Sequence, residues 1–348
     1  MFCVLRSAIW EVMMRTELEY REPPFCAYHY MASHGVVALE NPSGMVWFYQ
    51  NCTGLSCGRR FLDGYTAPEL AVTRHGILAN PHIDSYIVNA WFCPEDMRKT
   101  AKRMLDMGYY VLFDHVDDYY VEGKSFFGER HFYHDGLILG YDDTAGTLIL
   151  AAYNNKWSYG VFETSMDGFM KGLLAAAEAG ERPRFIAARA KKEEPSSLDI
   201  PAVFRTVEAY LRTDPTVHDC AARGDVHLCL VRYLELLAEG GIPYEKMDWR
   251  VMRLLWEQKK CLCGCIREVE RALSFSDEVS RSYQAVVDSA NLLRIQYARY
   301  HMKRDDALIP KMTARMLNIK ENEVLLLEKW MEKVKKRGNE DAVEYIEA

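Results

Sequence analysis

The sequence contains 348 residues, enough for about two domains, and its 49% of hydrophobic residues predicts a large buried core rather than disorder. The net charge is −7 and no basic stripe is present, which argues against nucleic-acid binding. No apolar run approaches the roughly 20 residues that cross a bilayer. Because residues 1–11 also lack a basic region and a small-residue cleavage site, we expect a cytoplasmic protein that has no membrane partner.

The first 190 residues alternate between predicted helices and short strands. Helices are expected at about 26–40, 94–107 and 165–180, and strand-like runs at 45–50, 109–114, 137–140 and 148–153. Pro94 suits the first turn of the second helix, and Gly108 ends that helix just before a strand. This order predicts an α+β domain over residues 1–190.

The remainder of the chain has a different character. Residues 190–197 are charged, small and broken by a proline, which is typical of a linker. Beyond them, apolar residues recur at spacings of three and four, as at Val226, Leu230 and Leu234. The pattern predicts a helical domain over residues 191–348, with helices at about 201–213, 218–239, 245–274, 277–303 and 321–347.

The stretch from His131 to Asp143 places titratable residues directly before a buried hairpin. His134 leads into Leu137-Ile-Leu, and the partner strand 147–153 ends in Asn154-Asn155. A base on one strand and an amide at the end of its partner would suit a histidine whose tautomer is fixed by a third group. His131 points to the opposite face of an extended segment, so His134 is favoured as the base. Asp135 and Asp142-Asp143 are expected to cap the strand and shape the turn.

Cys26 is the favoured nucleophile upstream of this hairpin. A helix should begin after Pro24, which would put Cys26 in a first turn whose dipole favours the thiolate. The N–H of Cys26 is then the expected oxyanion donor. The order Cys26, His134, Asn154 supplies nucleophile, base and orienting group, with Asn155 as the alternative to Asn154. A buried structural cysteine at a helix start is the competing interpretation of Cys26.

Other titratable residues have simpler interpretations. Cys52 lies in a Gly-rich stretch and is the second candidate nucleophile. The run Cys261-Leu-Cys263-Gly-Cys265 lacks the two-residue gap of zinc pairs, so structural thiols are expected and no metal site is predicted. The ten cysteines show no disulfide framework. Clustered aspartates such as 114–118 could bind a cation, but this segment favours a solvated loop, at most at the mouth of a substrate site.

Several motifs, taken together and in order, resemble a known family. They are Cys26-Ala-Tyr-His-Tyr-Met-Ala-Ser33, Trp47-Phe-Tyr-Gln-Asn-Cys52, His131-Phe-Tyr-His-Asp-Gly-Leu-Ile-Leu-Gly-Tyr-Asp142, Tyr159-Gly-Val-Phe-Glu-Thr-Ser-Met-Asp-Gly-Phe169, Phe185-Ile-Ala-Ala-Arg189, Val217-His-Asp-Cys220, Val226-His-Leu228 and Leu254-Leu-Trp-Glu-Gln-Lys-Lys260. The chain is similar in these segments to the butirosin-biosynthesis-H type family of papain-like cysteine acyltransferases.

The resemblance implies a papain-like cysteine-peptidase-type core with an antiparallel sheet and an N-terminal nucleophile helix, followed by a helical C-terminal region. It implies Cys26 as nucleophile, His134 as base and Asn154 as orienting residue, where family members often carry Asp. Papain-like proteases have a Gln shortly before the cysteine, whereas Tyr20 and its neighbours occupy that stretch here. The expected substrate-binding residues are His29, Tyr20, Trp47 and Tyr119. His29 lies one predicted helical turn from Cys26 and either lines the pocket or is a satisfied polar residue of the interior, and Tyr20 could donate a hydrogen bond to the oxyanion. Trp47 and Tyr119 belong to aromatic loops that could exclude water.

The expected activity is a cysteine-dependent acyltransferase that forms an amide in nonribosomal peptide or natural-product biosynthesis. The implied partners are an acyl or peptidyl carrier protein and a small amine, and a homo-oligomer is left open. No cofactor is expected beyond the phosphopantetheine arm that would carry the acyl donor. Hydrolysis by the same residues, as in a peptidase or thioesterase, is the alternative activity. An inert binding protein with a papain-like shell is a third interpretation.

Overall fold

A computed structural model describes residues 14–63, 66–72, 80–88, 94–192, 196–212 and 223–347, so residues 1–11 and the motif at 217–220 lie outside it. The chain forms two compact units. The sheet unit contains the residues up to Glu22 and Ile83–Lys191, and the helical unit contains Pro23–His82 and Lys192–Ala348. This division differs from the predicted domains 1–190 and 191–348, because residues 23–82 group with the C-terminal part of the chain.

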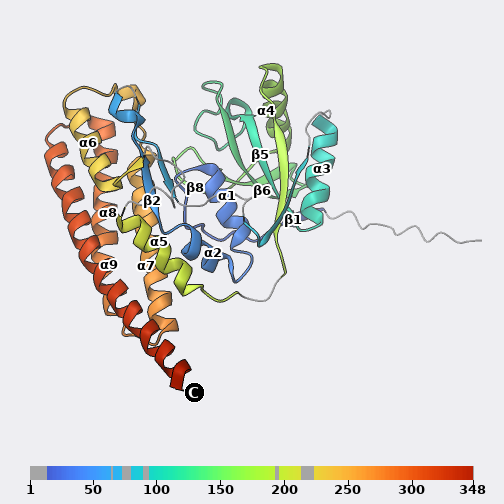
Figure 1. The fold of residues 1–348 in the computed structure, drawn as a ribbon. Coiled ribbons are helices and arrows are strands. Elements are labelled where there is room, and N and C mark those ends of the chain that lie inside the picture. The colour runs from blue at the N-terminus through green and yellow to red at the C-terminus, as the bar shows by residue number, and fades with distance from the viewer. Residues whose placement is uncertain are drawn as a thin grey trace, which may run out of the picture. The chain divides into compact units, whose positions relative to one another are not determined.

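An antiparallel sheet forms the centre of the sheet unit (Figure 1). Its path is β4-β9-β5-β6-β7-β8, and β1 pairs with β6 to make seven strands among the described residues. The predicted α+β class, with an antiparallel sheet and a helical C-terminal region, is confirmed. The strands are β1 (Arg15–Glu17), β4 (Ile83–Val88), β5 (Tyr110–Asp117), β6 (Tyr133–Asp142), β7 (Thr147–Tyr153), β8 (Tyr159–Ser165) and β9 (Arg184–Ala190).

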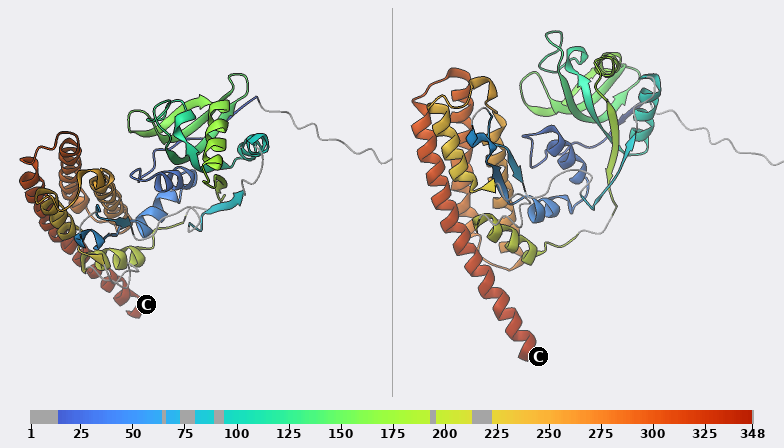
Figure 2. Two further views of the ribbon diagram at one scale, coloured as in Figure 1. Left: turned by 90° about the horizontal axis from the view of Figure 1, so that it is seen from above. Right: turned by 45° about the horizontal axis from the view of Figure 1, so that its top comes forward.

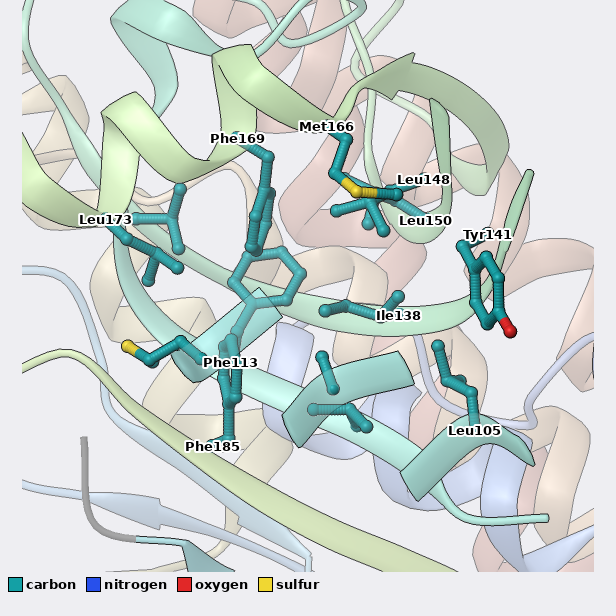
Figure 3. Close-up of a cluster of buried hydrophobic side chains, with 14 of the residues drawn as sticks. Leu105, Phe113, Ile138, Tyr141, Leu148, Leu150, Met166, Phe169, Leu173 and Phe185 are labelled. Atoms are coloured by element: carbon teal, nitrogen blue, oxygen red, sulfur yellow. The ribbon is translucent and has the colours of Figure 1, made fainter. Parts of the chain in front are cut away.

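Two helices, α3 (Pro94–Asp106) and α4 (Met166–Glu178), pack on the sheet and share one apolar core with it (Figure 3). Phe113 of β5 meets Phe169 of α4 edge to face, with ring centroids 4.9 Å apart. A register shift in β6 between Ile138 and Gly140 allows Ile138 and Tyr141 to enter the same core, although they are three residues apart.

A second irregularity lies in β5, beside the beginning of β6. Phe113 pairs with Gly136 and Val116 pairs with His134, so β5 carries one extra residue between these pairs. His115 has a φ of 53°, which is unusual for a residue with a side chain. A bulge of this kind bends a strand and changes where its following side chains point. It therefore determines where the aspartates after Val116 lie.

Gly140 is the point at which β1 lies closest to β6. A Cβ atom there would lie 2.1 Å from the carbonyl oxygen of Thr16. We expect Gly140→Ala to lower the free energy of unfolding by about 1–3 kcal/mol, because the β1 backbone must move. Gly160→Ala is the matched control, since a Cβ at that strand position meets nothing within 4 Å. Urea unfolding of both variants checks this, and equal stability of the two would contradict it.

Helices dominate the other unit, and α7, α8 and α9 run side by side (Figure 2). Its helices are α1 (His29–Ala38), α2 (Gly44–Asn51), α5 (Ile200–Arg212), α6 (Val226–Ala238), α7 (Arg250–Ala272), α8 (Glu278–Lys303) and α9 (Leu308–Glu347). Short 3-10 turns, η1 (Arg60–Asp63) and η4 (Tyr244–Lys246), and a small sheet of β2 (Leu55–Gly58), β3 (Leu70–Val72) and β10 (Arg223–Gly224) complete the described part. Among these helices none is long and apolar enough to cross a membrane.

The strand-like run at residues 45–50 is a helix, α2, and that prediction is wrong. The run is rich in aromatic and β-branched residues, which favour strands on a partly buried surface. A short apolar run has no clear periodicity, however, and burial decides its structure. Trp47 and Phe48 are both buried, and their rings pack against that of His34 on α1 at 4.8 and 5.2 Å.

The carboxylate of Glu323, on α9, joins five helices in the interior of the helical unit. Lys259 of α7 donates to it at 2.7 Å, Tyr210 of α5 at 2.8 Å, and Tyr283 of α8 donates to its other oxygen. The Nε2 atom of His227, on α6, lies 3.0 Å away. Burial alone raises the pKa of Glu323, but the charges of Lys259 and His227 and their hydrogen bonds outweigh it, and the pKa lies below its ordinary value.

Candidate active site

His134, at the start of β6, is held by a buried carboxylate. Its Nδ1 atom lies 2.5 Å from Oδ2 of Asp118. Asp118 is 1% exposed and opens the 3-10 turn η3 (Asp118–Tyr120), which follows β5 directly. Its backbone N–H donates to the carbonyl of Phe132 at 2.8 Å, which continues the pairing of β5 with β6 beyond the last ladder pair. Asp118 and His134 thus occupy adjacent ends of two paired strands.

The segment that contains Asp117 and Asp118 is not the solvated loop that the sequence predicts. Both side chains are buried, Asp117 completely, and each approaches a histidine. Asp117 Oδ2 lies 2.6 Å from Nδ1 of His131, while its Oδ1 accepts from the N–H of Tyr119 and caps the turn. The bulge at His115 brings Asp117 to His131 and Asp118 to His134. No pattern of residue types in the sequence predicts such a bulge.

Exposure distinguishes the two histidines. The His131 side chain is 58% exposed and stacks on Tyr119 with a centroid distance of 4.6 Å. The His134 side chain is 25% exposed and meets the ring of Phe132 edge to face at 4.3 Å. His134 therefore combines partial access with a fixed imidazole, which is what a general base requires. His131 is the more exposed of the pair, and its partner Asp117 also serves the turn.

Asn154, the predicted orienting residue, is used elsewhere. Its Oδ1 accepts from the backbone N–H groups of Lys156 at 2.9 Å and Ser158 at 3.2 Å, within the turn that follows β7. The side chain on Nδ1 of His134 is Asp118 instead. Asn155, the alternative, donates its backbone N–H to the carbonyl of Gly123 at 2.8 Å. The group beside Nδ1 of His134 is thus a carboxylate from the turn after β5 rather than an amide from the turn after β7.

Aromatic side chains surround His134 on the sheet unit. Phe126 stacks near the imidazole at 6.3 Å and contacts Phe132 and Trp157 at 5.0 and 5.7 Å. The guanidinium of Arg130 lies over the Phe126 ring, 3.8 Å from its centroid. Phe132 and Trp157 are exposed, so one side of this aromatic group faces outward. The sequence suggested aromatic loops but did not indicate that these rings gather around the histidine.

Cys26 lies in the helical unit, in the segment that leads into α1. The helix begins at His29, with Tyr28 as its N-cap residue in an extended conformation, so Cys26 is not in a first turn as predicted. Two prolines and the following residues extend before the helix, and a Cβ on Gly35 would clash with Pro23 at 2.4 Å. The Pro-Pro segment therefore packs back along α1 and delays its start. Cys26 itself is 5% exposed, and its Sγ lies 3.6 Å from the carbonyl of Pro23.

A buried carboxylate of α7 engages the backbone beside Cys26. The N–H of Ala27 donates to Glu257 at 2.9 Å, and Arg253 donates to the other oxygen at 2.8 Å. Burial raises the pKa of Glu257, while Arg253 and the backbone N–H groups of Ala27 and Cys26 lower it, and the net pKa is raised. The N–H of Cys26, the predicted oxyanion donor, is thus already directed at Glu257.

The predicted substrate-binding residues are distributed over both units. Tyr119 is half-buried beside His131, and Tyr20 is half-buried in the sheet unit before residue 22. His29 is half-buried at the first position of α1. Trp47 is buried in the core between α1 and α2, where it packs against His34 and supports that interface.

The other candidate thiols are structural in their surroundings. Cys52 is buried at the end of α2, and burial raises its pKa well above the ordinary value of a thiol. Cys261 and Cys265, one turn apart on α7, donate to backbone carbonyls of Phe48 and Tyr49 on α2. Such thiols pack as small hydrophobic groups and are poor nucleophiles. Among the described residues, no group of three or more His, Cys, Asp or Glu side chains is arranged to hold a metal ion.

A scan of the sequence against models of protein families found no match. A search of curated proteins likewise found no relative.

Proposed function

We propose that the protein is a cysteine acyltransferase in which Cys26 is the nucleophile, His134 the base and Asp118 the residue that orients the base. The observation that carries this proposal is the contact between the buried Asp118 carboxylate and Nδ1 of His134. A carboxylate in that position keeps the proton on Nδ1, so that Nε2 is the basic atom, and it stabilises the imidazolium that forms during reaction. The papain-like core, the carrier-protein donor and the amine acceptor are carried over from the family resemblance.

The proposed reaction proceeds in two transfers. Sγ of Cys26 attacks the carbonyl carbon of an acyl thioester after His134 takes the thiol proton, and the donor thiol leaves with that proton. The nitrogen of an amine then attacks the Cys26 thioester and gives its proton to His134. An amide leaves, and the free thiol of Cys26 is restored. The first exchange converts one thioester into another, so the sequence of steps needs no separate energy source.

The surroundings of Cys26 and of His134 support different parts of the proposal. Cys26 belongs to the helical unit and His134 to the sheet unit, so their pairing is part of the proposal. The low exposure of Cys26 supports selectivity for an amine, since water must be kept from the thioester. The exposed rings of Phe132 and Trp157 supply an apolar surface near the base. Because Glu257 engages the N–H of Cys26, no oxyanion donor is assigned.

Intact-protein mass spectrometry after incubation with an acyl-pantetheine thioester tests the assignment of the nucleophile. We expect the wild-type protein to gain the mass of one acyl group, and Cys26→Ala to gain none. Cys52→Ala is the matched control and should be labelled as the wild type is, because its thiol is buried and has a raised pKa.

Addition of a primary amine to the acylated protein then separates the activities. Loss of the adduct with formation of an amide supports the transferase. Formation of the free acid alone, with or without amine, would identify a hydrolase instead. An adduct that persists in Cys26→Ala and disappears in Cys52→Ala would refute the assignment of Cys26 as the nucleophile. The absence of an adduct with every donor tested would favour a binding protein.

A further inference from the structure

Lys124 is a buried cation behind the residues of the candidate base. Its side chain is 1% exposed, and its Nζ lies 3.4 Å from Oδ1 of Asp118, the oxygen that does not face His134. Nζ and this Oδ1 have no hydrogen-bond partner among the described residues. A lysine is rarely buried to this degree unless its charge is balanced. Asp118 is thus placed between an ammonium on one oxygen and an imidazole on the other.

The segment that carries Lys124 is fixed on both sides of it. Gly123 has a φ of 89°, and its carbonyl accepts from the N–H of Asn155, in the turn after β7. Ser125 donates its hydroxyl to the carbonyl of Asn154 at 2.8 Å. The amide residues that the sequence suggested as partners of His134 instead anchor the lysine segment. The position of Nζ is therefore built into the fold rather than left to a flexible side chain.

We propose that Lys124 is a positioning residue that balances the charge of Asp118, so that His134 stays a neutral base until it takes a proton. This inference rests on the proposed function of His134. With an ammonium present, the buried carboxylate is compensated while the imidazole is uncharged. Without the Lys124 ammonium, a proton on His134 would be needed to balance the charge of Asp118. The imidazole would then already carry the proton that a general base must accept.

Other charged groups around this trio do not replace Lys124. Asp117 has its own partner in His131, at 2.6 Å. Burial lowers the pKa of Lys124 below its ordinary value, and the charges of Asp118 and of Asp135, which follows His134 in β6, offset part of this effect. Burial raises the pKa of Asp135 above its ordinary value, although the neighbouring His115 and His134 lower it. Arg130 lies over the ring of Phe126.

The titration of the His134 imidazole, followed by NMR of the full chain with ¹⁵N-labelled histidine, tests the inference. The signal is assigned by its loss in His134→Gln. We expect Lys124→Met to move the titration midpoint up by about one pH unit, the order of magnitude of removing one nearby charge in a partly screened site. Lys124→Arg should restore most of the wild-type midpoint, because it returns the charge.

Lys102→Met is the matched control, since Lys102 forms an ion pair with Asp143 at the opposite end of β6. It should leave the midpoint of His134 unchanged. If Lys124→Met does not fold, as judged by circular dichroism, Lys124→Gln serves in its place because it keeps a polar end. A midpoint that stays within 0.3 units or so, or moves down, would overturn the inference.

The same experiment separates this inference from the proposed function. If Lys124→Met moves the His134 midpoint but the wild type forms no acyl adduct, the charge balance holds and the acyltransferase proposal fails. If the adduct forms and the midpoint does not move, Lys124 has no such role. If the wild type forms the adduct and Lys124→Met raises the midpoint, the acidic limb of the pH–rate profile for acylation should move to higher pH in this variant, in step with the NMR midpoint. A loss of stability alone would not produce this shift.

Discussion

Replacement of Asp118 by Asn should lower the rate of acyl-adduct formation by about 10³–10⁴-fold, the loss seen when the carboxylate behind a catalytic histidine becomes an amide. An amide can present its NH2 group to Nδ1 and favour the wrong tautomer, and it cannot balance an imidazolium. Single-turnover acylation followed by mass spectrometry measures the rate. The change preserves side-chain volume, so it tests the charge and the proton rather than packing.

Two further variants make this comparison specific. Asp117→Asn is the matched control, since Asp117 is the neighbouring buried carboxylate and contacts His131 rather than His134. Asn154→Ala should cost no more than about tenfold, because its side chain belongs to a turn and acts on the site only through the backbone. If Asn154→Ala were as damaging as expected for Asp118→Asn, and Asp118→Asn were mild, the amide would be the orienting residue after all.

Replacement of Glu323 by Gln should lower the free energy of unfolding by about 3–5 kcal/mol, as expected when one partner of a buried ion pair is removed. Lys259 would lose the carboxylate that pairs with its ammonium in the interior, and the hydroxyls of Tyr210 and Tyr283 would lose a strong acceptor. Glu321→Gln, two residues earlier on the exposed face of α9, is the control and should change stability by less than about 0.5 kcal/mol. Urea unfolding followed by circular dichroism compares the two.

The effect of pH on this variant has a definite sign. The pKa of Glu323 in the folded protein lies below its ordinary value of 4.5, so its ionised form stabilises the fold. This contribution is fully present above about pH 4.5 and is lost as the pH falls toward the lowered pKa. The stability difference between the wild type and Glu323→Gln should therefore narrow on acidification below pH 4.5. A difference that widened there, or one below 1 kcal/mol at pH 7, would contradict the central role of this carboxylate.

The sequence predicts the regular elements of this chain better than its irregular ones. The paired strands β6 and β7 follow from their apolar runs, and α7 and α8 from spacings of three and four over more than twenty residues. Long periodic segments carry their own structural signal. The short run at 45–50 has no clear periodicity, and burial of Trp47 and Phe48 makes it helical.

The candidate site depends on the irregular parts. A single extra residue at His115 brings Asp118 to His134, and two prolines with Gly35 delay the start of α1 beyond Cys26. The bulge and the late start of α1 both arise from tertiary contacts, which local sequence patterns do not predict. The histidine could be chosen from the sequence because it precedes a buried strand. Its partner Asp118 could not be chosen in this way. A polar Asp-Asp run after a strand is expected to be solvated, whereas the bulge at His115 places these two side chains in the interior.

The chain crosses between its two units after residues 22, 82 and 191, so residues 23–82, which include Cys26, are a part of the helical unit inserted between two segments of the sheet unit. The same topology means that a single cut near residue 190 isolates neither unit. A fragment beginning there would present the α7 face of Cys261 and Cys265 to solvent without the α2 surface that covers it.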